Sequence, residues 1–338
     1  MKLLTYIVPL YNSAKWLNKC LDSVLNQDFD EELVEIICIN DGSPDNSAEI
    51  ARSYQSEHPS IIVIDQDNQG TSGARNTGMR HATGKYLAFV DPDDFVEPNV
   101  YGSLVKQMEE EQLDMLRFNF QMVDEDYAIL EKPLSEKIFD YTPSLMSGPE
   151  FIASRLDGAC NIWRYIYRTD IITKNNIWCY QGDYYDDTPW LPLVLMKAQR
   201  INICDTIVYD YLERSNSLVK SVTEESIKRK IDGYLFLLPT LKKQHNSLNK
   251  YLPNVGENTQ RGVSNWYSKM EALSIISFFS IIALYRFKER HHYIRIVREF
   301  GLLPLKGTKL VPKALKKKRV INISPTLYMW MISIKNRH

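Results

Sequence analysis

Mostly apolar runs alternate with helically spaced apolar residues along the first 120 residues of the chain. Five runs rich in β-branched and aromatic residues predict buried strands at residues 3–8, 34–39, 61–64, 86–90 and 115–120. A helix follows the first strand, with Asn12 or Ser13 as its N-cap, and further helices are predicted at residues 46–57, 71–82 and 100–111. Strands of this kind, separated by helices, form a parallel sheet. We therefore expect an α/β fold with a Rossmann-like, mostly parallel sheet and helices on both faces.

The remainder of the chain has a different pattern. Residues 124–149 contain scattered proline and charge and predict a loop, whereas residues 151–211 are rich in Trp, Tyr and Asp. Residues 224–300 repeat apolar positions at helical spacing. We expect three parts: an α/β domain over residues 1–220, a helical region over 221–300 and a tail over 301–338.

Composition and charge narrow the possible functions. The 338 residues are 44% hydrophobic and 25% charged, which excludes a disordered or low-complexity chain. The net charge of -1 conceals an asymmetry, because residues 301–338 carry nine Lys or Arg and no acidic residue. An acidic body argues against nucleic acid as a partner, and the basic tail is suited to an anionic surface such as a membrane. A solvated terminal extension is the alternative for the tail.

Cysteine usage and hydropathy bear on location. The five cysteines are an odd number without a CxxC pair, which favours reduced thiols in the cytoplasm over a zinc or redox motif. The apolar run near the N-terminus is too short for a signal peptide. The longest mostly apolar run, residues 272–285, would rise about 21 Å as a helix, less than the roughly 30 Å of a hydrocarbon core. We therefore expect no membrane-spanning helix.

Polar clusters follow three of the predicted strands, and parallel strands bring such ends to one edge of a sheet, where ligands bind. The most acidic cluster, Asp91-Pro92-Asp93-Asp94, crowds three carboxylates where a buried strand ends. A divalent cation relieves the repulsion between like charges, and hard oxygen ligands select Mg²⁺ or Mn²⁺. An acidic turn is the alternative explanation, but the position at a strand end favours the metal.

Two further segments are suited to a nucleotide. Asp41 could accept a hydrogen bond from a base N–H while Gly42 lets the chain turn beneath it, although an ordinary Asp-Gly turn is the better explanation of the pair taken alone. The loop of residues 68–78 is rich in glycine and runs into a helix, where backbone N–H groups and Arg75 would attract an anion. Its glycines, including Gly78, could instead allow the helix to pack closely on the sheet.

A second acidic cluster lies at residues 183–187. Asp186 and Asp187 could supply a general base, with one carboxylate tuning the pKa of the other. Asp187 could also be the N-cap of a helix over residues 188–198 with Pro189 in its first turn. Aromatic rings flank the cluster, and such rings stack on sugars or fill a core. They are Trp163, Tyr165, Tyr167, Trp178, Tyr180, Tyr184, Tyr185 and Trp190.

The order of these segments resembles glycosyltransferase family 2, whose GT-A fold enzymes take sugar from a nucleotide diphosphate. The resemblance covers residues 3–217, and six motifs carry it in the right order and spacing. They are TYIVPLYN, ICINDGSPDNS, DNQGTSGARNTGM, YLAFVDPDDFVEPN, WCYQGDYYDDTPW and YDYLERSNS. The resemblance implies a set of nucleotide-sugar-binding positions. These are Pro9, Tyr11, Asn12, Asp41, Gly42, Arg75, Asn76, Asp91, Asp93 and Asp94.

The resemblance also implies a role for each group. Pro9 and Tyr11 would line the base pocket, and Asp41 would bind a uracil-type base. Arg75 and Asn76 would lie near the nucleotide. Asp91 would lie near the ribose and Asp93 would hold the metal, while Asp94 completes the motif. Asn216 and Ser217 match the end of the family's domain.

The mechanism that the resemblance implies is a single inverting displacement. Asp187 matches the proposed base, and Asp186 replaces the usual Glu with a shorter arm. The expected cofactor is Mn²⁺ or Mg²⁺, the donor a nucleotide sugar such as a UDP-sugar, and the acceptor a glycan or lipid-linked glycan of cell-surface polysaccharide synthesis. We expect a cytoplasmic protein, with possible tail contact at the inner face of the membrane. The alternative functions are those of a nucleotidyltransferase and of a non-catalytic carbohydrate-binding assembly protein.

Overall fold

A computed structural model describes residues 2–131, 140–156, 158, 160–180, 184–214, 221–306 and 310–335. The chain divides into two compact units. The first comprises residues 1–151 and 159–217, and the second comprises residues 152–158 and 218–338. The residues expected to form a separate tail therefore belong to the second unit.

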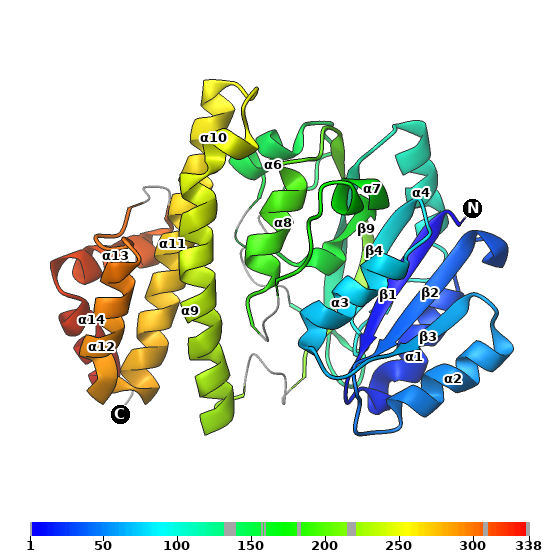
Figure 1. Cartoon of the computed structure of the whole chain (residues 1–338), viewed down its shortest axis with the longest axis horizontal. Coiled ribbons are helices and arrows are strands. Elements are labelled where there is room, and N and C mark those ends of the chain that lie inside the picture. The colour runs from blue at the N-terminus through cyan, green and yellow to red at the C-terminus, as the bar shows by residue number, and fades with distance from the viewer. Residues whose placement is uncertain are drawn as a thin grey trace. The chain divides into compact units, whose positions relative to one another are not determined.

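The first half of the sheet is parallel, as the apolar runs predict (Figure 1). Strands β1 (Leu4–Leu10) and β2 (Val34–Asn40) are buried along almost their whole length, so both of their faces are covered. β3 (Ile61–Asp65) pairs with β2, and β4 (Tyr86–Phe89) pairs with β1. The register places Leu10 beside Asn40, and Asn40 beside Asp65. The polar segments that follow these strands consequently share one edge of the sheet.

The second half of the sheet is mixed, and the sequence pattern did not predict it. β8 (Tyr165–Arg168) pairs antiparallel with β4 and with β6 (Met115–Val123), and β9 (Ile201–Leu212) pairs parallel with β6. The short strand β5 (Phe95–Val96) pairs with β9, and β7 (Ile129–Leu130) with β6. The strand order is β3-β2-β1-β4-β8-β6-β9-β5. The α/β class is thus confirmed, with the parallel arrangement concentrated in the first four strands.

The helices of the first unit connect these strands. They are α1 (Ala14–Leu25), α2 (Ser47–Glu57), α3 (Gly70–His81), α4 (Tyr101–Glu110), α6 (Gly148–Ser154), α7 (Thr169–Thr173) and α8 (Asp187–Leu195), with 3-10 turns at Glu31–Leu33 and Ile162–Arg164. Residues 124–149 are not all loop, because β7 and the start of α6 lie there. α3 packs on β1 and β2 so closely that a Cβ on Gly78 would lie 2.4 Å from Ile7. The packing explanation for this glycine is therefore confirmed.

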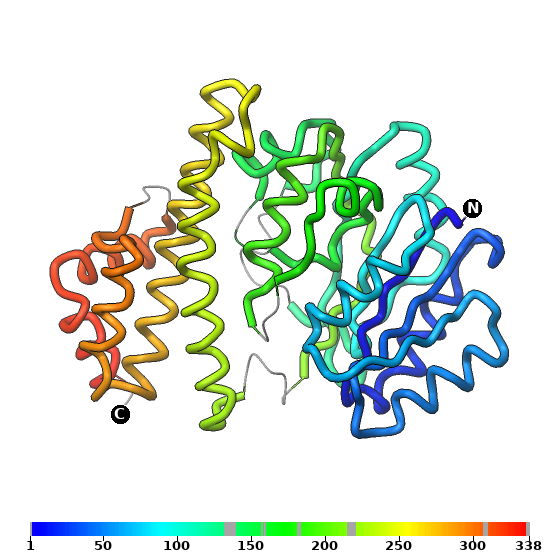
Figure 2. The backbone as a smooth tube through the Cα atoms, viewed as in Figure 1, coloured from blue at the N-terminus to red at the C-terminus, as the bar shows by residue number. Residues whose placement is uncertain are grey.

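The second unit is helical. Its elements are α9 (Glu224–Asn246), α10 (Leu248–Tyr251), α11 (Glu257–Tyr285), a 3-10 turn (Phe287–Glu289), α12 (Arg290–Glu299), α13 (Pro312–Ile323) and α14 (Pro325–Lys335). The two long helices α9 and α11 pack side by side (Figure 2). α11 has the length and hydropathy of a membrane-spanning helix, but 61% of its most apolar window is buried inside the protein, as in the core helix of a soluble fold.

The last two helices belong to this core. α13 and α14 both pack on α11, and the Tyr328 hydroxyl lies 2.8 Å from the Ser280 hydroxyl of α11. Tyr328 and Met329 are almost fully buried. Residues 310–335 are therefore folded, and the alternative of a solvated extension does not apply to them.

Candidate active site

The acidic cluster after β4 is held by β9, a strand far along the chain. The Asp94 carboxylate accepts hydrogen bonds from the Tyr209 hydroxyl at 2.8 Å and from the Leu212 N–H at 2.7 Å. The Tyr209 oxygen in turn accepts a bond from the Asp91 N–H at 3.0 Å. Only 2% of Asp94 is exposed, and burial raises its pKa well above the ordinary value. Asp94 therefore supports the loop from inside, whereas the resemblance had placed it among the nucleotide-binding positions.

The other two carboxylates of the cluster are partly exposed and face arginines. Asp91 lies 2.8 Å from Arg75, and Asp93 forms an ion pair with Arg214. Burial raises the pKa of Asp93, which the Arg214 charge opposes and the Asp91 charge reinforces. Within the part of the chain that the structure describes, no three His, Cys, Asp or Glu side chains gather closely enough to hold a metal alone. Mg²⁺ commonly takes only one or two carboxylates and completes its shell with phosphate and water, so Asp93 and Asp91 fit such an ion.

Arg75 of α3 joins the end of β4 to the start of α8. Its guanidinium lies 2.8 Å from Asp91, 3.0 Å from Asp187 and 3.6 Å from Asp186. Only 5% of the residue is exposed. Burial on its own would lower the pKa of Arg75, but the charges of the three carboxylates raise it well above the ordinary value. A permanent positive charge thus sits at the centre of three acidic groups that are distant in sequence.

Asp187 is a largely buried carboxylate whose pKa is raised. It is the first residue of α8, with Asp186 before it, so the prediction that Asp187 is the N-cap is wrong. Burial raises its pKa to about 7, although Arg75 opposes the shift and Asp186 adds to it. A carboxylate that titrates near neutral pH is matched to proton transfer there. Asp186 accepts a hydrogen bond from the Ser72 hydroxyl, which fixes it beside Asp187.

Asp41 lies at the end of β2 and is 2% exposed. One carboxylate oxygen accepts hydrogen bonds from the Gln66 side chain at 2.6 Å and from the Gln69 N–H at 2.8 Å. Its other oxygen has no protein partner among the residues described. Gly42 adopts a φ of 65°, a conformation that favours glycine, so the tight turn expected here is present.

The segment after β1 lies beside this turn. Pro9 is buried in β1 opposite Ile39, whereas 52% of Tyr11 is exposed. Asn12 has a left-handed φ of 53°, and its N–H donates to the Ser43 hydroxyl at 2.8 Å. An exposed ring and a buried carboxylate therefore lie at the ends of adjacent strands.

Asn76 has a structural partner. Its side-chain amide donates to the Cys179 carbonyl at 2.8 Å and accepts from the Cys179 N–H at 2.7 Å. Both polar ends of this buried side chain are engaged with one residue, so the contacts of Asn76 in this structure are structural ones, and its expected position near a nucleotide stays a prediction. Asn76 anchors the chain shortly before Asp187. The expected residues Gly182, Asp183, Asn216 and Ser217 lie outside the described residues.

Most of the flanking aromatic rings fill the core. Trp163 stacks on Tyr209 with ring centroids 4.3 Å apart, and Trp190 is fully buried against Phe89. Five of the eight rings are at most 6% exposed. These five are Trp163, Tyr165, Tyr167, Tyr184 and Trp190. The core explanation is therefore correct for them.

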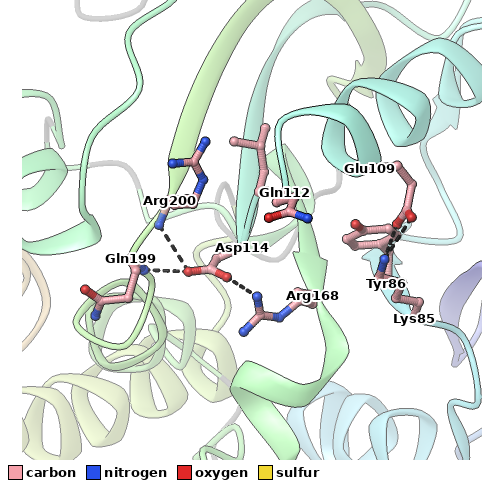
Figure 3. A pocket seen from close by; sticks show the side chains of 9 residues that line it. Lys85, Tyr86, Glu109, Gln112, Asp114, Arg168, Gln199 and Arg200 are labelled. Atoms are coloured by element: carbon pink, nitrogen blue, oxygen red, sulfur yellow. Dashed lines mark hydrogen bonds and ion pairs between the residues drawn. The ribbon is translucent and has the colours of Figure 1, made fainter.

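A cavity of about 480 Å³ lies elsewhere, at the amino ends of β4 and β6 (Figure 3). Its charged side chains are already paired. Asp114 lies 2.5 Å from Arg168, and Lys85 lies 2.6 Å from Glu109. Since ligands of parallel sheets bind at the carboxyl ends of the strands, this cavity is not the candidate site.

Comparison with known proteins decides the family. The family model described as Glycosyl transferase family 2 matches residues 5–156. The glycosyltransferase EpsJ of Bacillus subtilis is 34% identical over 235 residues, which cover 69% of this chain and 66% of EpsJ. The chain belongs to glycosyltransferase family 2. About a third of EpsJ has no counterpart in this match.

The GT-A fold of this family 2 chain is confirmed by solved structures. The crystal structure of S. aureus TarS 1–349 in complex with UDP-GlcNAc has a TM-score of 0.73 and 19% identity, and the match covers 100% of this chain and 92% of that one. The mannosyltransferase PcManGT of Pyrobaculum calidifontis, in complex with GDP-Man and Mn²⁺, has a TM-score of 0.50 and 13% identity. That match covers 98% of this chain and 86% of PcManGT. At these identities the likeness concerns the fold.

Several contacts of this family 2 site were not predicted. Tyr209 and Arg214 lie within the motif YDYLERSNS, but the pairing of β9 with β5, the strand that follows Asp94, brings them beside the acidic cluster. Ser72 and Gln66 each contact a site carboxylate, although no role was predicted for either residue from the sequence. A small polar residue such as Ser72 in a glycine-rich loop gives no indication of a partner more than a hundred residues away.

Proposed function

We propose that the protein transfers a sugar from a UDP-sugar to a hydroxyl of a glycan or lipid-linked glycan, with inversion at the anomeric carbon and with a divalent metal. The observation that carries this proposal is the position of Arg75 between Asp91 and Asp187. One buried guanidinium couples the expected donor side of the site to a carboxylate with a raised pKa.

The chemistry follows from these residues. Asp187 accepts the proton of the acceptor hydroxyl, whose oxygen forms a bond to the anomeric carbon as the bond from that carbon to the diphosphate breaks. Arg75 keeps the base next to the donor and offsets the charge of the three carboxylates. A single base without a second nucleophile gives inversion, by analogy with glycosidases.

The donor and the metal are proposed from the residues at the strand ends and from the ligands of the similar structures. Asp41 and Tyr11 are suited to a uracil-type base, and the TarS structure with UDP-GlcNAc supports a UDP-sugar as donor. Asp93, with Asp91, would hold Mn²⁺ or Mg²⁺, as the Mn²⁺ in the PcManGT structure suggests. The bound cation would neutralise negative charge on the departing diphosphate. Arg214 would have to release Asp93 when the ion binds.

We further propose a cytoplasmic location with peripheral contact at the inner face of the membrane. The five cysteines are free and buried, which suits a reducing compartment. Acceptors carried on lipid would make a location at the membrane useful in the synthesis of cell-surface polysaccharide.

The test is turnover of a panel of UDP-sugars, measured as UDP release, with and without Mn²⁺. The proposal expects Mn²⁺-dependent release from at least one donor, and loss of that release in the variant Asp187→Asn. Donor binding without turnover of any sugar would support a non-catalytic carbohydrate-binding protein.

A further inference from the structure

The last helix, α14, is apolar on two opposite sides. Its inner side carries Tyr328 and Met329, which are at most 3% exposed. Its outer side carries four large apolar residues at i, i+3, i+4 and i+7, the spacing of a single helix face. They are Leu327, Trp330, Met331 and Ile334, with 43%, 52%, 49% and 39% of each exposed. We call these four residues the outer face of α14.

Such a face is unusual on a helix that already buries its other side. A helix that is apolar all round belongs to a protein core or to a membrane. The outer face of α14 includes a tryptophan, a residue that favours the boundary between water and lipid. The C-terminal residue of α13, Ile323, is 80% exposed and adds to the apolar surface at the junction of the two helices.

The neighbouring helix α13 carries positive charge and no carboxylate. α13 packs on α14 and exposes Lys313, Lys316 and Arg319, which lie along one side of the helix. None of the three forms an ion pair with a residue that the structure describes. Residues 301–338 contain no carboxylate that could neutralise them. Positive charge beside an apolar stripe matches an anionic lipid surface, since the lysines meet headgroups while the apolar residues enter the acyl boundary.

We propose that the outer face of α14 inserts into the interface of an anionic membrane, and that Lys313, Lys316 and Arg319 contact its headgroups. Only the role of this membrane contact, which is to bring the enzyme to lipid-linked acceptors, rests on the proposed function. Naming the residues that enter the bilayer deepens the expectation of membrane contact. These membrane-contacting residues are distinct from the apolar residues of α11, which lie in the core of the second unit.

Vesicle sedimentation of the full chain tests the proposal. We expect partitioning onto vesicles with about one-third phosphatidylglycerol to exceed that onto pure phosphatidylcholine by at least tenfold at low salt. The substitution of Lys313, Lys316 and Arg319 by Gln should reduce binding about 100-fold. A matched control, with Gln at the exposed positions Lys228, Lys243 and Lys250, removes the same charge and should change binding by less than about threefold.

The apolar half of the face needs its own variant. Trp330→Ser combined with Met331→Ser should also lower vesicle binding at least tenfold, whereas Val222→Ser, at a position 63% exposed, should not. Deletion of residues 301–338 is a poorer test, because it removes the buried contacts of α14 with α11.

The outcomes separate the proposals. If UDP release persists in the variants while vesicle binding is lost, the membrane inference is supported and the enzymatic proposal stands. Equal binding of the variant and control chains to anionic vesicles would overturn the inference. So would a solution dimer, detected by light scattering, that disappears in Trp330→Ser with Met331→Ser, because a second copy would then cover the face.

Discussion

Replacing Asp187 by Asn should make the protein more stable at pH 8 while removing its activity. The pKa of Asp187 rises from 3.8 to about 7 mainly because the group is buried. At about 1.4 kcal/mol per pKa unit, ionising this carboxyl at pH 8 costs the folded state roughly 4 kcal/mol. Partial contact with water, at 25% side-chain exposure, lowers the expected gain of the Asn variant to about 2–4 kcal/mol.

The sign of the pH dependence follows from the direction of the shift. A carboxyl with a raised folded-state pKa contributes most to stability below its unfolded pKa, and this contribution is lost as the pH rises toward 7. The variant has nothing to ionise at this position. Its stability advantage should therefore widen by about 1–2.5 kcal/mol between pH 5 and pH 8.

Thermal unfolding followed by circular dichroism measures the difference. For a unit of this size, 1 kcal/mol corresponds to about 2–4 °C, so the Tm gap between variant and wild type should widen by about 2–10 °C. Asp45→Asn is the control. Burial raises the pKa of Asp45, but hydrogen bonds from Ser43, Ser47 and Ala14 outweigh it and lower the pKa to about 2. That variant should lose stability by a similar amount at both pH values, and a constant gap for Asp187→Asn would refute the reasoning.

Three further predictions concern the same cluster. Asp93→Ala should abolish most of the gain in UDP affinity that Mn²⁺ provides, and calorimetry that found an unchanged metal dependence would argue against Asp93 as the metal ligand. Arg75→Met leaves buried carboxylates without their partner and should cost about 3–5 kcal/mol, measured as a fall in Tm; an unchanged Tm would mean that the ion pairs do not form. Asp94→Ala removes the acceptor of two buried hydrogen bonds and should cost about 2–4 kcal/mol, with Tyr209→Phe costing about 1, and equal effects of the two would contradict the geometry.

The parallel half of the fold could be predicted because its signal is local. Runs such as residues 34–39 are apolar except at Glu35 and end in a turn with Gly42, so strand, direction and edge follow from sequence alone. β8 has only four residues, and β9 contains an exposed stretch at residues 205–207, so neither has the periodicity of an isolated strand. Their pairing depends on contacts across the sheet.

The candidate site, like the fold, could be predicted only in part from the sequence. The carboxylates at strand ends could be selected in advance, since strand ends converge on one edge. Which of these carboxylates face solvent could not be predicted, because Asp94 is buried by β9, over a hundred residues away in sequence. The contact of Asn76 with Cys179, equally distant in sequence, could not be predicted either. Arg75 was expected near the nucleotide, but its three acidic neighbours became apparent only when α3 and α8 were placed together.

The most direct test of Asp187 as the base is a paired measurement on Asp187→Asn. Donor affinity and single-turnover rate are determined for the variant and the wild type with the same UDP-sugar and Mn²⁺. We predict that the donor Kd stays within about threefold, while the rate of transfer falls by about 10²–10⁴. Transfer at the wild-type rate by this variant would contradict the account.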